Sequence, residues 1–204
     1  MLFYDAANPA PNPRRVRIYL AEKGLSVPRE MVAIPAGEHK SEAFRAINPL
    51  GQIPALKLDD GSVITESVSI CRFFEAIHPT PPMFGSGAKG LAEVDMWTRR
   101  IELRLMTPLA AVWMHTHPFT ARVVKPQYTD YGESQKPRVV AAMAEFDRFL
   151  ADREWLDGKS YTIADIVLLT TVDFAAFVGV GMPDELEHLS AWQKRASARP
   201  SAAA

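Results

Sequence analysis

A proline at the start of a short apolar strand limits most strongly how this chain can fold. Pro54 follows a turn-forming stretch at residues 48–51, and it has no backbone N–H to donate to a neighbouring strand. Such a proline is tolerated where the preceding residue, Ile53, faces a ligand instead of another strand. A cis Ile53–Pro54 bond would expose the Ile53 backbone N–H and C=O, which can then pair with an extended peptide. The turn therefore predicts a backbone clamp for a small peptide.

The residues after this turn predict a β-hairpin and then an amphipathic helix. Residues 55–58 and 62–65 have strand-like composition and flank an Asp-Asp-Gly turn. Large apolar residues between positions 70 and 77 recur with the spacing of one helix face. Glu66 and Ser67 lie at the N-terminus of that helix, where free N–H groups and the helix dipole stabilise a carboxylate. The pair alone is more simply a helix cap, but beside the proline turn it favours a ligand site.

The chain divides into two predicted domains. Residues 1–78 read as strand, loop, helix and strand before the proline turn, with a proline-rich loop at residues 5–13 and a helix from Arg14. Residues 79–90 are dense in proline, glycine and serine, which is typical of a linker. Residues 91–204 contain helical patterns without convincing strands. We therefore expect the fold class α/β plus all-α, with a helical bundle as the second domain.

A capping box marks the core helix of the second domain. Thr162 is placed as the N-cap, and Asp165 then falls at the third helical position, where its carboxylate can bond back to the cap. The following helix, at residues 163–178, carries few charges and should be buried.

Composition excludes several classes of function. The 204 residues include 23 basic and 24 acidic side chains and a formal net charge of −1, so no overall field favours nucleic acid or an anionic membrane. The single cysteine, Cys71, excludes an internal disulfide and a Cys-x-x-Cys pair, and a cytoplasmic location is expected. No signal-peptide pattern or membrane-spanning segment is present, so membrane association is not expected. No zinc-type ligand spacing is present either, and neither a bound metal nor a prosthetic group is expected.

The proline turn, the hairpin and Glu66-Ser67 resemble the glutathione-binding half of the cytosolic glutathione transferase (GST) superfamily. The similarity extends over nearly the whole chain, including the capping box at residues 162–165. It implies the GST fold, in which an N-terminal thioredoxin-like domain precedes a C-terminal helical bundle. It also implies glutathione as co-substrate, a bacterial-type member of the superfamily, and a homodimer.

The resemblance implies roles for residues that match the family positions. Ile53 would pair through its backbone with the cysteinyl part of glutathione, and Pro54 would shape the turn. Glu66 and Ser67 would hold the γ-glutamyl amine and carboxylate. Gln52 would assist in binding the γ-glutamyl group. His39 and Lys40 would bind the glycine carboxylate.

The group that activates the thiol is where this sequence departs from the family. A free thiol has a pKa of ~8.5, and lowering it by about two units takes about 2.7 kcal/mol, which charge-assisted hydrogen bonds and a helix N-terminus can supply. Family members place Ser or Cys at the position matched by Ala10, which has no donor. Asn12 resembles the asparagine of a bacterial group with glutathione-dependent disulfide reductase activity. We therefore expect Asn12 to donate to the thiolate, with Asn8 as the second choice. Tyr4 is expected to be a core residue, and a contact of its hydroxyl with the thiolate is the lesser alternative.

The electrophile is expected against the first half of the helical domain, on an apolar wall formed by Trp113, Met114, His115 and Phe119. The leading function is attack of glutathione on a small hydrophobic electrophile, as in detoxification. Ala10 leaves two alternatives open. One is a glutathione-dependent peroxide or disulfide reductase, and the other is a GST-like binding module without turnover.

Overall fold

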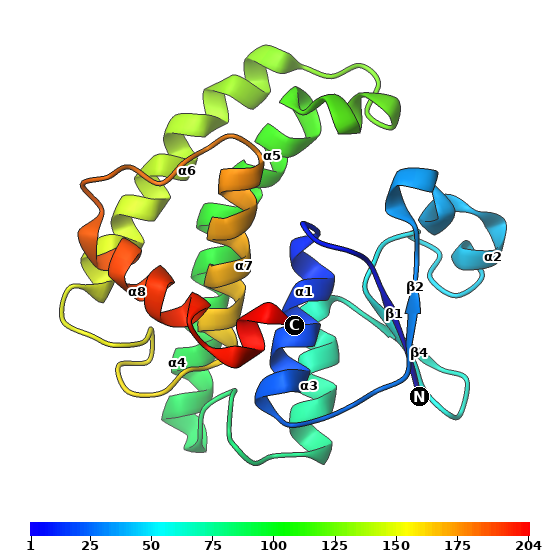
Figure 1. The fold of residues 1–204 in the computed structure, drawn as a ribbon, viewed down its shortest axis with the longest axis horizontal. Helices are drawn as coiled ribbons and strands as arrows, with labels where there is room; N and C mark the ends of the chain where they lie inside the picture. Colours follow the sequence, from blue (N-terminus) through cyan, green and yellow to red (C-terminus); the bar gives the residue numbers. More distant parts are fainter. The chain divides into compact units, whose positions relative to one another are not determined.

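A computed structural model describes all 204 residues, which form two compact units (Figure 1). Unit 1 comprises Met1–Phe84 together with the C-terminal residues Arg199–Ala204. Unit 2 comprises Gly85–Ala198. Each unit has its own buried apolar core and is described separately below.

Unit 1 is built on a mixed four-stranded sheet with the strand order β2-β1-β3-β4. Strand β1 pairs in parallel with β2 and antiparallel with β3, which pairs antiparallel with β4. The elements of unit 1 are β1 (Leu2–Asp5), α1 (Pro11–Glu22), β2 (Arg29–Met31), η1 (Ile34–Ala36), η2 (Glu38–Lys40), α2 (Glu42–Arg45), β3 (Ala55–Lys57), β4 (Val63–Thr65), α3 (Ser67–Ile77) and η5 (Pro200–Ala203), where η1, η2 and η5 are 3-10 helices.

Helices α1 and α3 pack against each other and lie on one face of this sheet (Figure 1). Alternate side chains of β1 point to the two faces of the sheet. Phe3 is fully buried, while Tyr4 packs edge-on against Phe44 at 5.7 Å between ring centroids. Tyr4 is therefore a core residue, as its position in the strand predicts.

Helix α1 begins earlier than its hydrophobic pattern predicts. The helix includes Pro11, Asn12 and Pro13, so the preceding loop ends at Ala10 and not at residue 13. Proline is favoured in the first turn because its N–H has no intrahelical partner there and its φ is already helical. This start places Asn12 inside the first turn of α1.

The predicted linker at residues 79–90 is structured at both of its ends. On the unit 1 side, the Lys23 ammonium donates to the carbonyl of His78 at 2.8 Å and pairs with Glu75 at 2.5 Å. The other Glu75 oxygen accepts the N–H groups of Met83 at 2.9 Å and Phe84 at 3.3 Å. These bonds bind residues 78–84 to α1 and α3.

On the unit 2 side, the first helix begins at Gly87, inside the predicted linker. A Cβ added at Gly85 would lie 2.4 Å from the carbonyl oxygen of Gly90. Gly85, which resembles a linker residue in the sequence, is therefore needed for a close approach of its backbone to the first turn of this helix.

The C-terminal residues also differ from the predicted second domain of 91–204, because they belong to unit 1. The Arg199 guanidinium makes two parallel hydrogen bonds of 2.7 Å to the carboxylate of Glu22 in α1. Ser201 bonds to the same carboxylate, and Arg14 reaches the carbonyl of Ala202 at 3.2 Å. The tail therefore lies along α1, in contacts between residues far apart in the sequence.

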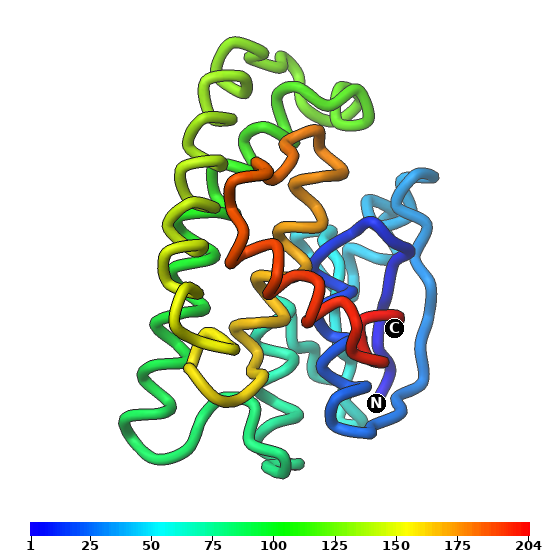
Figure 2. Tube along the Cα trace, turned by 60° about the vertical axis from the view of Figure 1, so that its left-hand side comes forward, coloured from blue at the N-terminus to red at the C-terminus, as the bar shows by residue number.

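All regular elements of unit 2 are helices, whose turns can be followed in the tube trace of Figure 2. Helix α5 packs against α6, and α7 is buried along nearly its whole length, as its shortage of charges predicts. No helix of the protein is both long and apolar enough to cross a membrane. The elements of unit 2 are α4 (Gly87–Arg100), the π-helical segment η3 (Ile101–Met106), α5 (Thr107–Thr116), the 3-10 helix η4 (Pro118–Arg122), α6 (Thr129–Leu150), α7 (Ile163–Phe177) and α8 (Glu187–Ser197).

Asp165 joins three parts of unit 2. The predicted capping box is present at the start of α7, where the Asp165 carboxylate accepts the Thr162 N–H at 3.0 Å. It also accepts the Leu156 N–H at 3.1 Å and the indole N–H of Trp192, in α8, at 3.0 Å. Burial raises the pKa of Asp165 to about 6, and these donors act in the opposite direction by stabilising the carboxylate.

We expect Asp165→Asn to lower the free energy of unfolding by about 2 to 3 kcal/mol, because an amide NH₂ would replace an acceptor that faces buried donors. Urea unfolding measures the change. Asp184→Asn, at an exposed position, is the matched control and should change stability by less than about 0.5 kcal/mol. Equal midpoints for the two variants would contradict this role of Asp165.

Candidate functional site

The register of the sheet brings three segments of unit 1 to one edge. Ala55, at the start of β3, lies opposite Tyr4 near the end of β1 and opposite Thr65 at the end of β4. The loop after β1, the turn before β3 and the first residues after β4 therefore meet at this edge. These are the segments that contain Asn8, Pro54 and Glu66.

The proline turn leaves one backbone unit open. The Ile53–Pro54 bond is cis, and the N–H and C=O groups of Ile53 make no hydrogen bond within the protein. Asn48, which is 2% exposed, braces the turn: its amide donates to the Gln52 carbonyl at 2.7 Å and its Oδ1 accepts the Leu50 N–H at 3.2 Å. The sequence identified Asn48 only as a turn former, and its bracing role depends on a burial that local patterns do not reveal.

Glu66 has a strained backbone at the N-terminus of α3. Its φ of 66° makes it the one residue other than glycine with a positive φ, a conformation that costs about 1–3 kcal/mol. The neighbouring Ser67 begins the helix and is 6% exposed. Neither side chain hydrogen-bonds to the rest of the protein, so a carboxylate and a hydroxyl remain available at a helix N-terminus.

His39 and Lys40 lie beside the proline turn. The Lys40 ammonium donates to the carbonyls of Leu50 at 3.2 Å and Gly51 at 2.7 Å, which ties η2 to the turn. An ammonium has three N–H donors, so one of them remains for a ligand. Desolvation, and then the charge of Lys40, lowers the pKa of His39, whose buried Nδ1 has no partner. His39 is therefore a neutral donor or acceptor at neutral pH.

The two asparagines lie at the N-terminal end of α1. Asn12 is exposed in the first turn, and its side chain makes no hydrogen bond within the protein. Asn8 is also exposed, but its Oδ1 accepts a hydrogen bond of 2.5 Å from Arg17. Ala10 is the N-cap of the helix and provides no side-chain cap. The donors present at this helix end are therefore backbone N–H groups and two amides.

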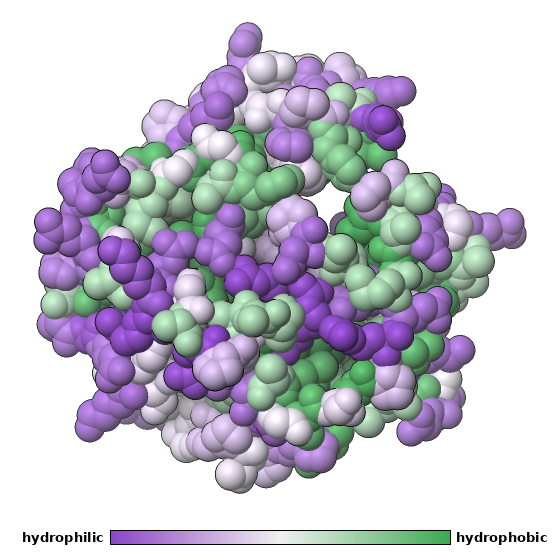
Figure 3. Space-filling view, in the orientation of Figure 1, coloured by the Kyte–Doolittle hydropathy of each residue, from purple (hydrophilic) through white to green (hydrophobic).

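Unit 2 contains a cluster of aromatic rings around Trp113, which we call the aromatic cluster. Trp113 stacks on Phe119 at 5.8 Å between centroids, and Phe119 is 42% exposed. Figure 3 shows hydrophobic residues at the surface beside η4. The remaining rings are those of His117, Phe174 and Phe177, whose centroids lie 4.4, 5.3 and 5.8 Å from that of Trp113.

The predicted electrophile wall is only partly assembled. Trp113 and Phe119 lie together, and Met114 is 40% exposed. His115 does not join them, because it contacts the rings of Tyr128 and Tyr131 at 5.9 and 5.5 Å. Successive positions on a helix face different directions, and this separates His115 from Trp113.

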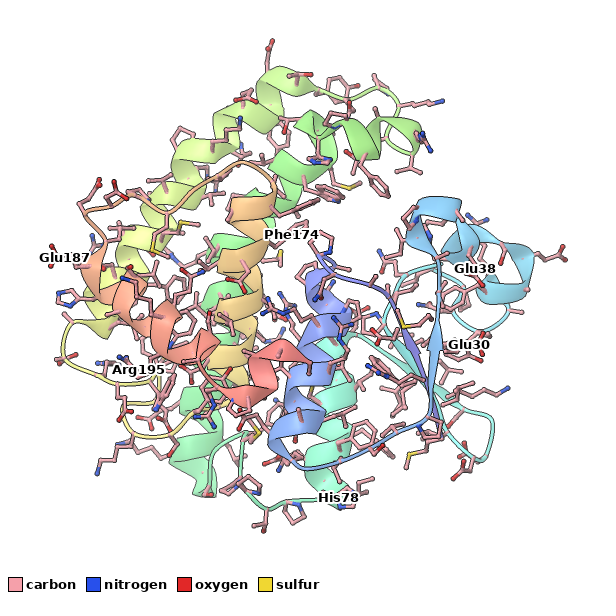
Figure 4. The ribbon with its side chains drawn as sticks, viewed as in Figure 1. Glu30, Glu38, His78, Phe174, Glu187 and Arg195 are labelled. Atoms are coloured by element: carbon pink, nitrogen blue, oxygen red, sulfur yellow. The ribbon has the colours of Figure 1, made fainter.

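The sequence did not place three members of the aromatic cluster in the predicted electrophile wall: His117, Phe174 and Phe177. The two phenylalanines have the spacing of one helix face near the end of α7, where Figure 4 labels Phe174. This spacing was the available signal, but their contact with α5 joins residues far apart in the chain. No group of three or more His, Cys, Asp or Glu side chains is placed to hold a metal ion.

Comparisons with known proteins agree with this architecture. The family models "Glutathione S-transferase, N-terminal domain" and "Glutathione S-transferase, C-terminal domain" match residues 10–77 and 110–200. Glutathione S-transferase 2 of Saccharomyces cerevisiae is 37% identical over 98% of this chain and 87% of its own length. Rat glutathione S-transferase theta-1 is 27% identical over 89% of this chain and 77% of its own length.

Solved structures give the same result. A glutathione S-transferase domain-containing protein of Marinobacter aquaeolei superposes with a TM-score of 0.93 at 37% identity, covering 98% of this chain and 99% of that one. Gtt2 of Saccharomyces cerevisiae gives 0.92 at 35% identity, covering 98% of each chain. The chain belongs to the glutathione S-transferase family, and the predicted fold class, a thioredoxin-like domain followed by a helical domain, is confirmed.

The strained backbone of Glu66 generates a prediction that separates stability from binding. Glu66→Gly should raise the free energy of unfolding by about 0.5–1 kcal/mol, because glycine adopts a positive φ without strain. If Glu66 holds the γ-glutamyl amine, as the resemblance implies, the same change should weaken glutathione binding by about tenfold or more, because the carboxylate is lost. Thermal unfolding and isothermal titration calorimetry measure the two effects.

Glu66→Gln is the matched control for this pair of effects. It removes the charge but retains the side chain and its strained backbone, so affinity should fall while stability stays unchanged. A Glu66→Gly variant less stable than Glu66→Gln would contradict the strain at this position.

Proposed function

We propose that this glutathione transferase binds glutathione along the sheet edge of unit 1 and activates the thiol at the N-terminus of α1 for attack on a small hydrophobic electrophile. The transferase activity itself follows from family membership over nearly the whole chain. The observation that carries the proposal is the shared register of Tyr4, Ala55 and Thr65, which brings the loop after β1, the proline turn and the start of α3 to one edge of the sheet.

The γ-glutamyl-cysteinyl part of glutathione would occupy the proline turn and the start of α3. The open N–H and C=O of Ile53 can form the two hydrogen bonds of a short antiparallel pairing with the cysteinyl residue. Glu66 would accept from the γ-glutamyl ammonium group. Ser67 and the N-terminal N–H groups of α3 would bind the γ-glutamyl carboxylate, with exposed Gln52 assisting.

The glycine carboxylate of glutathione would lie between η2 and the proline turn. Lys40 has one N–H left after its bonds to the Leu50 and Gly51 carbonyls, and that donor is charged. The neutral ring of His39 would donate a second hydrogen bond. Because Lys40 also ties the two loops together, its replacement should affect both affinity and the geometry of the turn.

The chemical step requires a thiolate. The thiol proton leaves to solvent, the sulfur forms a bond to the electrophilic carbon, and the leaving group departs with the electrons of the broken bond. The N-terminus of α1 and an amide N–H of Asn12 or Asn8 would stabilise the negative sulfur before it attacks. Stabilising the ionised form lowers the pKa of the thiol.

The electrophile would bind at the aromatic cluster of unit 2. Exposed Phe119 and the neighbouring ring of Trp113 offer stacking surface to a flat apolar molecule, with Met114 beside them. His115 faces other rings and takes no part in this wall. A homodimer, a cytoplasmic location and a role in detoxification complete the proposal.

A second function is favoured by one observation, the absence of a side-chain donor at Ala10. Asn12 resembles the asparagine of a bacterial group with glutathione-dependent disulfide reductase activity. In such a reaction the thiolate would attack a peroxide oxygen or a disulfide sulfur and displace hydroxide, alkoxide or a thiolate, and a second glutathione would then react with the oxidised sulfur to give glutathione disulfide. Parallel assays of conjugation, hydroperoxide reduction and disulfide reduction distinguish the two activities. A protein that binds glutathione and performs none of these reactions would be the binding module left open by the sequence.

Alanine substitution at the two asparagines tests activation of the thiol. Removing the amide that bonds to the thiolate should lower kcat/KM for conjugation about 10- to 100-fold, since a hydrogen bond to a charged group contributes about 1.5–3 kcal/mol. The Kd for glutathione should change by less than about threefold, because the other anchors remain. Chlorodinitrobenzene conjugation and calorimetry measure these quantities for Asn12→Ala and Asn8→Ala.

Ser26→Ala, in an exposed loop, is the control for these variants and should leave kcat/KM unchanged. Full activity in both asparagine variants would contradict activation by an amide.

Replacement of an exposed ring tests the electrophile site. Phe119→Ala should raise the KM for an aromatic electrophile about 3- to 10-fold, through loss of about 0.5–1.5 kcal/mol of stacking, while the KM for glutathione stays constant. Val123→Ala, at a position 65% exposed, should change neither value. Equal increases in both KM values would argue against a site of this kind.

A further inference from the structure

We infer that Arg17 is a positioning residue of the thiol site: its guanidinium holds the carbonyl oxygen of the Asn8 side chain and so presents the Asn8 amide N–H groups to the thiolate. The inference rests on the proposed function, and it selects Asn8 over Asn12 as the oriented donor.

Both terminal nitrogens of the Arg17 guanidinium donate hydrogen bonds. Arg17 is in α1 and is 8% exposed. Its Nη1 donates to Oδ1 of Asp5 at 2.5 Å and to the carbonyl of Ala6 at 2.9 Å. Its Nη2 donates to Oδ1 of Asn8 at 2.5 Å. One planar group therefore fixes the end of β1, the start of the loop and the side chain of Asn8.

Other charged groups surround the guanidinium of Arg17. Asp5, its ion-pair partner, is 1% exposed and also accepts the Ala6 N–H at 2.8 Å. The second oxygen of Asp5 faces the guanidinium of Arg29, in β2, at 3.5 Å. A buried ion pair of this kind specifies geometry more than it adds stability, because desolvation of both charges offsets their attraction.

The chemistry of the amide explains why the contact matters. An asparagine side chain has one acceptor oxygen and one NH₂ with two donors. A guanidinium can only donate, so the reversed orientation would place NH₂ against N–H and is excluded. With Oδ1 bound to Arg17, the Asn8 NH₂ points away from the guanidinium and makes no hydrogen bond within the protein. The neighbouring charge also polarises the amide, which makes its N–H groups better donors.

No neighbouring side chain fixes the amide of Asn12. Its side chain has no partner, so orienting it toward a thiolate would require loss of rotamer freedom at the moment of binding. Asn8 has already lost this freedom through Arg17. Preorganised donors stabilise charge more effectively than donors that must reorganise.

The test uses Arg17→Lys with a pH profile of conjugation. The ammonium of the introduced lysine can still pair with Asp5. It cannot also donate to Asn8, because it lacks the second terminal nitrogen of the planar guanidinium. The acidic limb of the kcat/KM profile reports ionisation of the thiol and should move to higher pH by about one unit. At slightly acidic pH this shift corresponds to a tenfold loss of kcat/KM. The KM for glutathione should change by less than about threefold.

Arg29→Lys is the matched control, because Arg29 approaches the same carboxylate without touching Asn8. It should leave the acidic limb in place. The double variant Arg17→Lys/Asn8→Ala should be no worse than Asn8→Ala alone, since both changes remove the same oriented donor.

Two results would overturn the inference. In the first, Arg17→Lys lowers the melting temperature but leaves the acidic limb unmoved, which would make Arg17 a structural ion pair only. In the second, the effects of Arg17→Lys and Asn8→Ala add fully.

Failure of the proposed function has a different signature, which is absence of conjugation by the parent protein at any pH. The inference then rests on the side-chain NH₂ resonances of Asn8, followed by NMR as glutathione is added. A shift in the parent that is lost in Arg17→Lys supports positioning by Arg17, and equal shifts in both proteins overturn it.

Discussion

The pairing of β3 with both of its neighbours is the constraint on which the proposed glutathione site depends. Ala55 lies opposite both Tyr4 and Thr65. The loop after β1, the turn before β3 and the residues after β4 therefore meet at one edge of the sheet. A shift of either strand by one residue would turn its side chains to the opposite face and move its loop away from the others. The site is therefore specified by the sheet core, in which Phe3 and Leu56 are fully buried.

Most of the groups gathered at this edge belong to the backbone. Ile53 offers N–H and C=O groups, and α1 and α3 each offer a helix N-terminus. The buried side chains hold this backbone in place: Asn48 braces the proline turn, and Arg17 braces the loop after β1. In the proposed site, this division would let a chain with Ala10 at the position of the family's Ser or Cys still bind the thiol. The helix end and the fixed loop remain when one hydroxyl or thiol is absent.

The sequence revealed those features whose physical cause is local. The proline turn, the hairpin, the helix after Glu66 and the capping box at Thr162 and Asp165 all follow from residue type and short-range spacing. The early start of α1 was also local, since Pro11 suits a first helical turn, but the hydrophobic pattern began later and determined the predicted boundary. Patterns of apolar residues locate the buried face of a helix better than they locate its ends.

The features that the sequence did not reveal join distant residues. The tail lies along α1 through Arg199 and Glu22, and the aromatic cluster brings Phe174 and Phe177 to Trp113. The hydrogen bond from Arg17 to Asn8, on which the proposed choice of Asn8 rests, likewise joins α1 to the loop after β1. Such pairings depend on the packing of helices, which no short pattern encodes.

The central claim is that unit 1 activates the thiol of glutathione without Ser or Cys at position 10. Ultraviolet difference titration of glutathione bound to the purified protein, which follows thiolate absorbance against pH, tests it most directly. The account predicts that the bound thiol ionises about two units below the free value of ~8.5. Tight binding of glutathione with an unshifted thiol would contradict it.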